Sequence, residues 1–437
     1  MTSSSRADRP ARTKLRRWAP RAALLVGSLL VAEGLLRLFL VARGLPQSPA
    51  GLGERIETVL GRFGDNVAAK LSEDGADANP ERRFSHPFQA WETEEGLAWL
   101  EQRLARGPST ADGRYEIWLV GGSVAYNFGK SKGGPRFIEL LRADPRFAGR
   151  TIELENCAHP EYKEPQQVLL VVYLLSLGLA PDAIIDLNGF NEAAIGDSNV
   201  KLGSHPAFPS IAAWSALQAP READPELARI KDGLVSARDR ARRVGECALT
   251  RGCLHSALLG WAAVLYVERC NTRWSQLVSE YETWVRSRRD DLRFRGPRLP
   301  DTKPDAILDA IVTNFEQSSR TLSAICDKRW ITYLHVLQPT MNDGSKPLSA
   351  EEQALPALKP AWVEGVRTGY PRLRATGVEL KKSGIAFEDA SDVFKDVPTT
   401  LYFDAIHFGD EGNELLAERI ARAFLASLPI DIGLDER

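Results

Sequence analysis

Two short motifs bring together residue types that can perform nucleophilic catalysis. Gly121-Gly122-Ser123 ends an apolar run, and Asp404-Ala405-Ile406-His407 lies near the C-terminus. A serine hydroxyl is a poor nucleophile until a base removes its proton. A carboxylate three residues before a histidine can accept a hydrogen bond from one ring nitrogen and leave the other facing a serine. The pattern predicts a triad in which His407 is the base for Ser123 and Asp404 orients His407.

A third motif, Asn188-Gly189-Phe190-Asn191-Glu192, follows another apolar run. A side-chain amide at this point could donate a hydrogen bond to an oxyanion, and one such donor is typically worth about 3 kcal/mol of transition-state stabilisation. Alone, this motif or the Gly-Gly-Ser would be an ordinary turn after a strand. The three motifs together favour an enzyme.

Other readings of the same segments fit less well. Val124 and Ala125 follow the serine, so the segment lacks the G-x-S-x-G elbow of α/β-hydrolases. Gly129-Lys130-Ser131 ends like a phosphate loop, but the first glycine of that motif would fall at Val124. No CxxC pair or His/Cys cluster suggests a metal, and no cofactor is expected. Lys and Arg number 56 against 58 Asp and Glu, which does not indicate a nucleic-acid partner.

The remaining histidines are weaker candidates for the base. His335 lies within a predicted strand, which favours a core or supporting position. His159 follows the second predicted strand and could line the cleft, so His159 and Gly122 are the candidates for substrate binding. Three further histidines lie outside the predicted sheet edges or in an insertion: His86, His255 and His205.

Alternating strands and helices must position these residues. Apolar runs predict strands at 115–120, 151–156, 182–187, 331–337 and 385–389, with helices at 136–141, 166–177 and 414–425. Asp410 is a candidate N-cap for the last helix. This alternation predicts a three-layer α/β/α domain with a five-stranded parallel sheet. Ligands of such sheets bind at the carboxyl ends of the strands, where the serine stands. Residues 197–320 form a helical insertion, either a small core or a lid.

The N-terminus predicts a membrane anchor. Residues 1–21 are basic and are expected to be cytoplasmic, and residues 22–42 are apolar enough for a transmembrane signal-anchor. Glu33 and Arg37 stand one helical turn apart and can pair. A stalk and a segment leading into the domain follow at 43–113, and the catalytic domain at 114–437 would be extracytoplasmic, in the periplasm or outside the cell. A cleaved signal peptide is the alternative.

Five cysteines fit an oxidising compartment if some of them are paired. Cys247, Cys253, Cys270 and Cys326 are the disulfide candidates, with no connectivity implied. Cys157 ends a predicted strand and is expected to be a buried free thiol.

The motifs together resemble the SGNH/GDSL hydrolase superfamily, whose domain is flavodoxin-like. LVGGSVAY looks like its serine block, NGFNE like its asparagine block, and FDAIHFGDEGNELLAERI like its final block. The resemblance covers roughly residues 115–428, interrupted by the insertion. It implies Ser123 as nucleophile, His407 as base, Asp404 as its orienter, and Asn191 with the Ser123 backbone N–H as oxyanion donors.

One position departs from the superfamily pattern. The glycine that supplies a further oxyanion N–H falls at Glu161, or alternatively at Ala158. A backbone N–H survives the change if Glu161 adopts the conformation that glycine permits. The negative charge of a carboxylate near the oxyanion would disfavour formation of the oxyanion.

The resemblance implies a serine esterase that acts on ester groups, O-acetyl groups first, of an extracytoplasmic carbohydrate or lipid. An O-acyltransferase with the same triad, or a non-catalytic glycan-binding or scaffold protein of the cell envelope, is the alternative. The expected partners are an ester-bearing substrate such as a polysaccharide, and the membrane through the single N-terminal helix; protein partners are left open.

Overall fold

The structure is a computed structural model that describes residues 11–63, 83–106, 113–218, 224–288, 291, 296–343 and 345–428. The chain divides into two compact units. The first comprises residues 1–66 and 232–277, and the second comprises residues 67–231 and 278–437. The start of the predicted basic segment 1–21 lies outside the described residues, and so do residues 64–82 and 107–112 of the predicted stalk.

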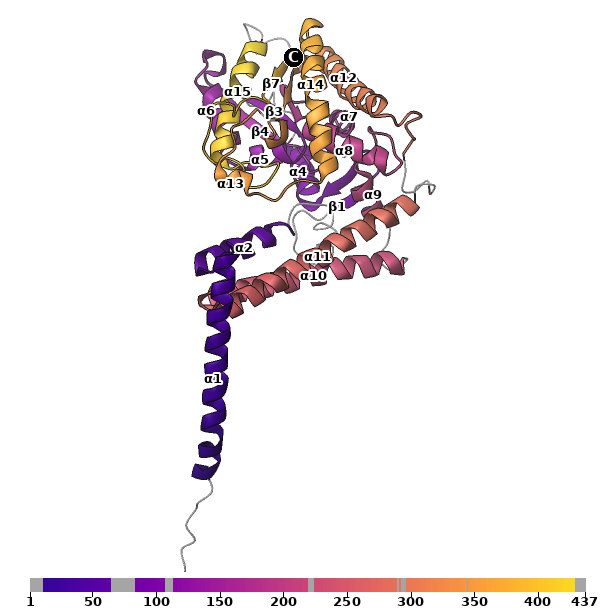
Figure 1. The fold of residues 1–437 in the computed structure, drawn as a ribbon. Helices are drawn as coiled ribbons and strands as arrows, with labels where there is room; N and C mark the ends of the chain where they lie inside the picture. Colours follow the sequence, from indigo (N-terminus) through magenta and orange to yellow (C-terminus); the bar gives the residue numbers. More distant parts are fainter. Residues whose placement is uncertain are drawn as a thin grey trace, which may run out of the picture. The chain divides into compact units, whose positions relative to one another are not determined.

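A five-stranded parallel sheet forms the centre of the second unit (Figure 1). In spatial order its strands are β4 (Thr151–Asn156), β3 (Arg114–Gly121), β5 (Ala183–Asn188), β6 (Thr332–Leu337) and β7 (Phe387–Asp389). This order is that of flavodoxin-like sheets. Every residue of β5 is buried, as expected for a strand covered on both faces.

The register of the central strands brings two of the motifs together. Gly121, the last residue of β3, pairs with Leu187 of β5. The serine motif that follows β3 and the asparagine motif that follows β5 therefore leave the sheet side by side.

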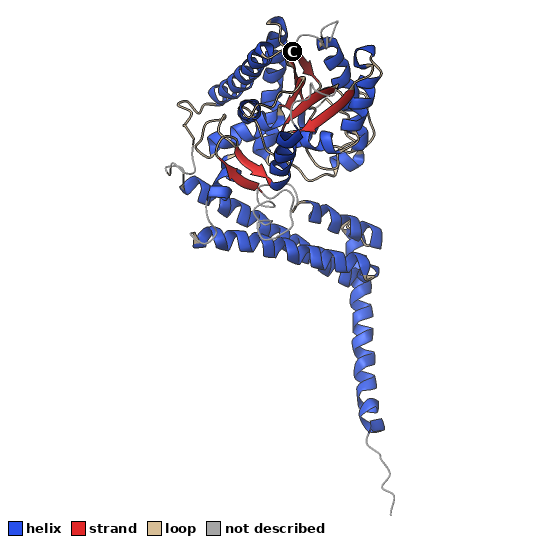
Figure 2. Ribbon diagram, turned by 180° about the vertical axis from the view of Figure 1, so that it is seen from behind, coloured by secondary structure: helices blue, strands red, loops and turns tan. Residues whose placement is uncertain are grey.

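Two groups of helices flank the sheet, and the strands are seen between them in Figures 1 and 2. On one face α6 contacts both α5 and α15, and α5 packs on β3 and β4. On the other face α12 contacts α7, α8 and α14. The first group is α5 (Ser123–Lys130), α6 (Gly133–Arg142) and α15 (Asp410–Ser427), and the second is α7 (Gln166–Ser176), α8 (Phe190–Lys201), α12 (Pro304–Lys328) and α14 (Pro360–Lys382).

Shorter elements complete the second unit. β1 (Arg83–His86) and β2 (Ala90–Thr93) form an antiparallel hairpin that leads into α4 (Glu94–Arg106). The others are η2 (Pro145–Phe147), α9 (Ile211–Gln218), η4 (Met341–Asp343) and α13 (Ala350–Gln353). The predicted stalk thus contains regular structure in its described part.

The first unit is helical. Its elements are α1 (Ala11–Ala42), α2 (Pro49–Gly61), η3 (Cys253–His255), and the parts of α10 (Pro225–Thr250) and α11 (Ala257–Ser287) that fall within residues 232–277. The predicted insertion at 197–320 therefore contains α9, α10, α11 and most of α12. An apolar cluster holds the first unit together and includes Leu40, Leu52, Ile56, Leu254, Trp261 and Val264.

The prediction of a transmembrane signal-anchor at residues 22–42 is wrong. Among the described residues, no helix combines the length and the apolar character that a bilayer span needs. The same finding contradicts the predicted localisation as a single-pass membrane protein. The physical reason is visible at Glu33 and Arg37, which interrupt the apolar run and are used for contacts within the protein.

Glu33 caps the beginning of α11. Its carboxylate accepts hydrogen bonds from the backbone N–H groups of Ala257 and Leu258, at 2.6 and 2.9 Å, and from the hydroxyl of Ser256 at 2.9 Å. Arg37 donates to Glu33 at 2.9 Å and to the carbonyl of His255 at 2.8 Å. The hydrogen bond from Leu258, together with these others, lowers the pKa of Glu33 to about 2.

All five cysteines are free thiols. The predicted pairing among Cys247, Cys253, Cys270 and Cys326 is therefore absent from the structure. Cys157 is buried, as expected, and burial raises the pKa of its thiol.

Candidate active site

Two glycines place Ser123 at the start of α5. Gly121 has φ +145°, and a Cβ atom there would lie 2.1 Å from the carbonyl oxygen of Leu187. At Gly122 a Cβ atom would lie 2.4 Å from the side-chain nitrogen of Asn191. Glycine is therefore required at position 121, where backbone blocks a side chain, and a side chain at position 122 would displace the Asn191 amide. The role of Gly122 in substrate binding stays a prediction, whereas its steric role is evident.

Ser123, His407 and Asp404 form a continuous hydrogen-bonded series. The distance from Ser123 Oγ to His407 Nε2 is 2.7 Å, and that from His407 Nδ1 to Asp404 Oδ2 is also 2.7 Å. An ionised Asp404 accepts from Nδ1–H, which leaves the lone pair of Nε2 to accept the serine proton. Residues 284 positions apart thus meet in the geometry of a nucleophile, a base and an orienting group.

The loop of Asp404 is held by its own backbone. Asp404 Oδ1 accepts from the N–H groups of Ile406 and His407, both at 2.7 Å. Burial raises the pKa of Asp404, but the hydrogen bonds from the side chain and backbone of His407 and from the Ile406 N–H outweigh burial, so the pKa lies below its usual value. Asp404 is therefore a carboxylate at neutral pH. The Phe403 ring, 60% exposed, stacks on His407 with a centroid distance of 6.1 Å.

Asn191 lies at the start of α8, close to the serine motif. Its side-chain nitrogen donates to the carbonyl oxygen of Tyr162 at 2.8 Å. A primary amide has two N–H donors, so this bond uses one and orients the other. The proximity of Asn191 to Gly122 brings that amide to the N-terminus of α5, where backbone N–H groups also favour negative charge.

Glu161 has the backbone conformation that glycine usually supplies. Its φ is +67°, in the left-handed region. Arg83 holds this turn: its guanidinium donates to the carbonyl oxygen of Pro160 at 3.0 Å and lies 3.6 Å from Glu161 Oε1. The ion pair balances the carboxylate that would otherwise disfavour an oxyanion. Arg83 also stacks over Trp91, 5.0 Å from the ring centroid. The sequence contained no signal for the contribution of Arg83.

His159 is buried beside the same turn. Its Nε2 lies 3.4 Å from Glu92 Oε1, and its ring packs on Tyr162 with a centroid distance of 4.6 Å. Burial lowers the pKa of His159 to about 3 and raises that of Glu92 to about 7. Desolvation thus outweighs the attraction between the two: His159 is neutral at neutral pH, and Glu92 is only partly ionised there. These contacts favour a supporting role, and substrate binding by His159 stays a prediction.

Buried carboxyl groups tie the Glu161 turn to α8. Glu192 accepts from the backbone N–H of Glu164 at 2.9 Å and from that of Gly189 at 2.7 Å. The side-chain nitrogen of Asn188 donates to Asp186 at 2.9 Å and to Glu164 at 3.2 Å. Burial raises the pKa of all three acids, that of Asp186 to about 7. Glu192 was recognisable only as part of the asparagine motif, three residues after the helix-capping Gly189.

His335 is a core histidine, as predicted. It is fully buried, its Nε2 lies 2.9 Å from the side-chain oxygen of Asn188, and its Nδ1 lies 2.9 Å from the hydroxyl of Ser319. Burial lowers the pKa of His335 to about 3, so the ring is neutral. Its contact with Asn188 supports the first residue of the asparagine motif.

Comparison with known proteins yields a distant structural neighbour. The fold resembles that of a protein from Bacteroides fragilis named a "putative acylhydrolase", with a TM-score of 0.34 and 10% sequence identity, over 77% of this chain and 100% of that one. No protein-family model and no curated protein matches the sequence. At this distance, the function has to be argued from the site itself.

Proposed function

We propose that this protein is a serine esterase that works through an acyl-enzyme on Ser123. The observation that carries the proposal is the hydrogen-bonded series from Ser123 Oγ through His407 to Asp404, with both distances at 2.7 Å. The lowered pKa of Asp404 supports it, because an ionised carboxylate holds the histidine in the tautomer that accepts a proton at Nε2.

In the proposed mechanism, Ser123 Oγ attacks the ester carbonyl carbon while its proton passes to His407 Nε2. The tetrahedral oxyanion accepts hydrogen bonds from the free N–H of the Asn191 amide and from the backbone N–H groups of Ser123 and Glu161. When the intermediate collapses, the bond to the alcohol breaks and His407 returns the proton to the departing oxygen. Water then attacks the acyl carbon while one of its protons passes to His407. The bond to Ser123 Oγ breaks, His407 returns the proton to that oxygen, and the acid is released.

The left-handed backbone of Glu161 supports its place in this oxyanion site. A side chain in place of glycine would favour the alternative of a non-catalytic scaffold if it strained the turn or repelled an oxyanion. The hydrogen bond from Arg83 to Pro160 holds the turn, and the ion pair between Arg83 and Glu161 offsets the charge of the carboxylate.

The substrate class we propose is an O-acetyl ester, first of all on a carbohydrate. Its support is the resemblance of the three motifs to the SGNH/GDSL superfamily, which is an argument by analogy. An O-acyltransferase would use the same residues and differ only in which hydroxyl group takes the acyl group from Ser123.

The test uses the full chain, a chromogenic acetyl ester and a fluorophosphonate that labels activated serines. Wild type should release acetate and be labelled at Ser123, and Ser123→Ala should do neither. Ser176→Ala is the matched control, because the Ser176 hydroxyl donates to the Val172 carbonyl of its own helix, at 2.7 Å, and to no other group in the described part of the chain. It should behave as wild type.

Three outcomes separate the alternatives. Acetate release in water supports the esterase. If an added oligosaccharide becomes acetylated as the main product, the protein is a transferase. If wild type and Ser123→Ala are equally inert and neither is labelled, the triad is not catalytic. Glycan binding by the inert protein is then the property to measure.

A further inference from the structure

The loop after β6 is packed against the loop that carries Asp404 and His407. We call residues 338–343 and 345–353 the β6 loop, and residues 399–407 the acid–base loop. Both belong to the second unit. Within the β6 loop, Lys346 and Glu352 form an ion pair of 2.6 Å whose side chains are 1% and 0% exposed. Burial of this kind needs further hydrogen bonds to offset the loss of water.

The acid–base loop supplies those hydrogen bonds. Glu352 Oε1 accepts from the backbone N–H groups of Leu401 and Tyr402, at 2.9 and 3.0 Å. Lys346 Nζ donates to the carbonyl oxygen of Thr399 at 2.9 Å. Burial raises the pKa of Glu352, but hydrogen bonds from Lys346 and from the backbone outweigh it and lower the pKa, so the group is a carboxylate. The ion pair thus holds the chain that immediately precedes Asp404.

A second contact reaches the chain between Asp404 and His407. The side-chain nitrogen of Asn342 donates to the carbonyl oxygen of Ala405 at 3.0 Å. The acid–base loop is therefore held on both sides of Asp404 by side chains of the β6 loop.

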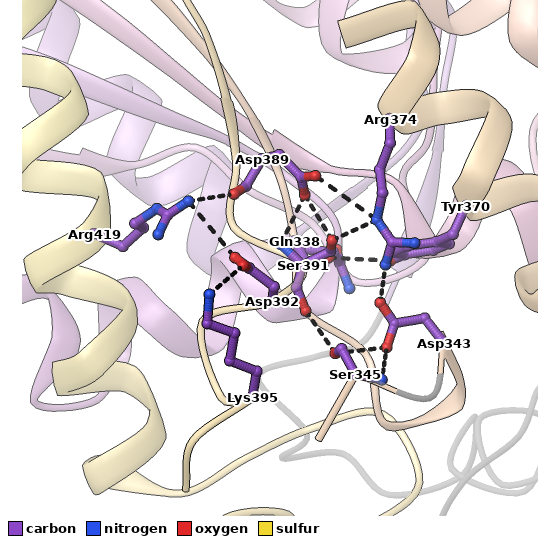
Figure 3. A network of polar contacts seen from close by, with 10 residues as sticks. All are labelled: Gln338, Asp343, Ser345, Tyr370, Arg374, Asp389, Ser391, Asp392, Lys395 and Arg419. Carbon is purple, nitrogen blue, oxygen red and sulfur yellow. Dashed lines mark hydrogen bonds and ion pairs between the residues drawn. The ribbon is translucent and has the colours of Figure 1, made fainter. Parts of the chain in front are cut away.

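The base of the β6 loop is itself held in place by charged groups. The side chain of Asp343, next to Asn342, is buried and pairs with the guanidinium of Arg374 on α14. It also accepts from the hydroxyl of Ser345 at 2.8 Å. Arg374 Nε also donates to Ser391, after β7, at 2.8 Å. Figure 3 shows these residues converging between α14 and the segment after β7. The β6 loop is thus tied to the sheet edge and to a flanking helix.

We infer that Glu352, Lys346 and Asn342 are positioning residues, which hold the acid–base loop so that His407 meets both Ser123 and Asp404. This inference rests on the proposed esterase function. None of the three touches the reacting atoms; they act through the backbone of residues 399–405. A displacement of about 1 Å in a catalytic group can cost on the order of 10²-fold in rate, so loss of these contacts should appear in kcat.

The experiment compares Glu352→Gln with Glu116→Gln. Glu116 is an equally buried acid, 0% exposed and paired with Arg103 at 2.5 Å, but it lies in the first half of β3 and makes no contact with the acid–base loop in the described structure. Both substitutions remove the carboxylate from a buried ion pair, so both should lower the unfolding midpoint. Only Glu352→Gln should also lower kcat for the acetyl ester, by roughly 10- to 100-fold, with KM nearly unchanged.

Asn342 provides a second measurement that does not risk the fold. Asn342→Ala removes the donor to Ala405, whereas Asn342→Asp places a carboxylate against the same carbonyl. We expect the rate of fluorophosphonate labelling at Ser123 to fall in the order wild type, Asn342→Ala, Asn342→Asp, with unfolding midpoints close to that of wild type. If Glu352→Gln does not fold, the labelling rates of the Asn342 variants test the positioning role.

The outcomes for this inference and for the proposed function are distinct. If wild type is active but Glu352→Gln or both Asn342 variants retain its kcat and labelling rate, the positioning role is overturned and the esterase stands. If Glu116→Gln loses as much kcat as Glu352→Gln, the effect is general destabilisation, which also overturns it. An inert and unlabelled wild type overturns the esterase and the positioning role together.

Discussion

Replacing Glu161 by glycine and by alanine tests the backbone conformation on which the proposed oxyanion site depends. At most positions glycine is the less stable of the two by about 0.5–1 kcal/mol, because it loses more conformational freedom on folding. At φ +67° a Cβ atom costs about 1–2 kcal/mol, which glycine avoids. Both variants lose the contact with Arg83, so that loss cancels. Glu161→Gly should therefore be more stable than Glu161→Ala by about 0.5–1 kcal/mol, the reverse of the usual order.

The assay is urea unfolding of both variants, read from the difference in midpoints at equal m-values. Glu139 on α6 is the control position, because it is exposed and helical. There, glycine should be less stable than alanine by about 1 kcal/mol. If alanine is as stable as glycine at position 161, the left-handed conformation and the reasoning built on it are refuted.

The activity of Glu161→Gly and of Glu161→Gln tests whether the Glu161 carboxylate takes part in the chemistry. If Glu161 contributes only its backbone N–H, Glu161→Gly and Glu161→Gln should retain kcat within about threefold, since that N–H is kept. A loss greater than about tenfold in both would show that the carboxylate takes part, and the proposed oxyanion site would need revision.

Four further predictions follow from the described contacts. Asp404→Asn should lower kcat on the order of 10⁴-fold, because an amide favours the wrong histidine tautomer; steady-state kinetics with a loss below tenfold would contradict this. Asn191→Ala should lower kcat by about 10²- to 10³-fold by removing an oxyanion donor, and an effect on KM alone would argue against that role. The folded pKa of Asp186 is raised to about 7, so its contribution to stability is present at acid pH and is lost as the pH rises towards 7. Asp186→Asn should therefore gain stability relative to wild type as the pH rises from about 4 to about 7, and unfolding curves that show no such trend would refute the shift. The folded pKa of Glu33 is lowered to about 2, so its stabilisation is present above its usual pKa and is lost as the pH falls towards 2. Glu33→Gln should cost about 1 kcal/mol at pH 7, and the difference from wild type, followed by circular dichroism, should shrink in acid.

Strand positions were predictable because burial on both faces of a parallel sheet leaves continuous apolar runs. The run at 115–120 became β3 (Arg114–Gly121), and the run at 182–187 became β5 (Ala183–Asn188). Helix ends were less predictable. Asp410, expected as an N-cap, is the first residue of α15, and Gly409 is its N-cap. A cap depends on the backbone angles at one residue, which the loop before it determines.

The membrane prediction failed for a different reason. A basic stretch followed by apolar residues is typical of an anchor, but the pattern does not say what the charges within it contact. Glu33 binds backbone groups more than 220 positions away. Such a contact is decided by tertiary packing, and the charge of Glu33 is offset inside the protein.

The sequence by itself determined the chemistry that one loop can offer. Asp404 and His407 are three residues apart, and the backbone geometry of a single turn is enough to join them. Tertiary structure decided everything that depends on distant residues: that Ser123 meets His407, that Arg83 balances Glu161, and that Glu352 holds the chain before Asp404. The reason is physical. Short-range spacing is governed by the local backbone, whereas contacts between segments depend on how the strands are ordered and how the side chains between them pack.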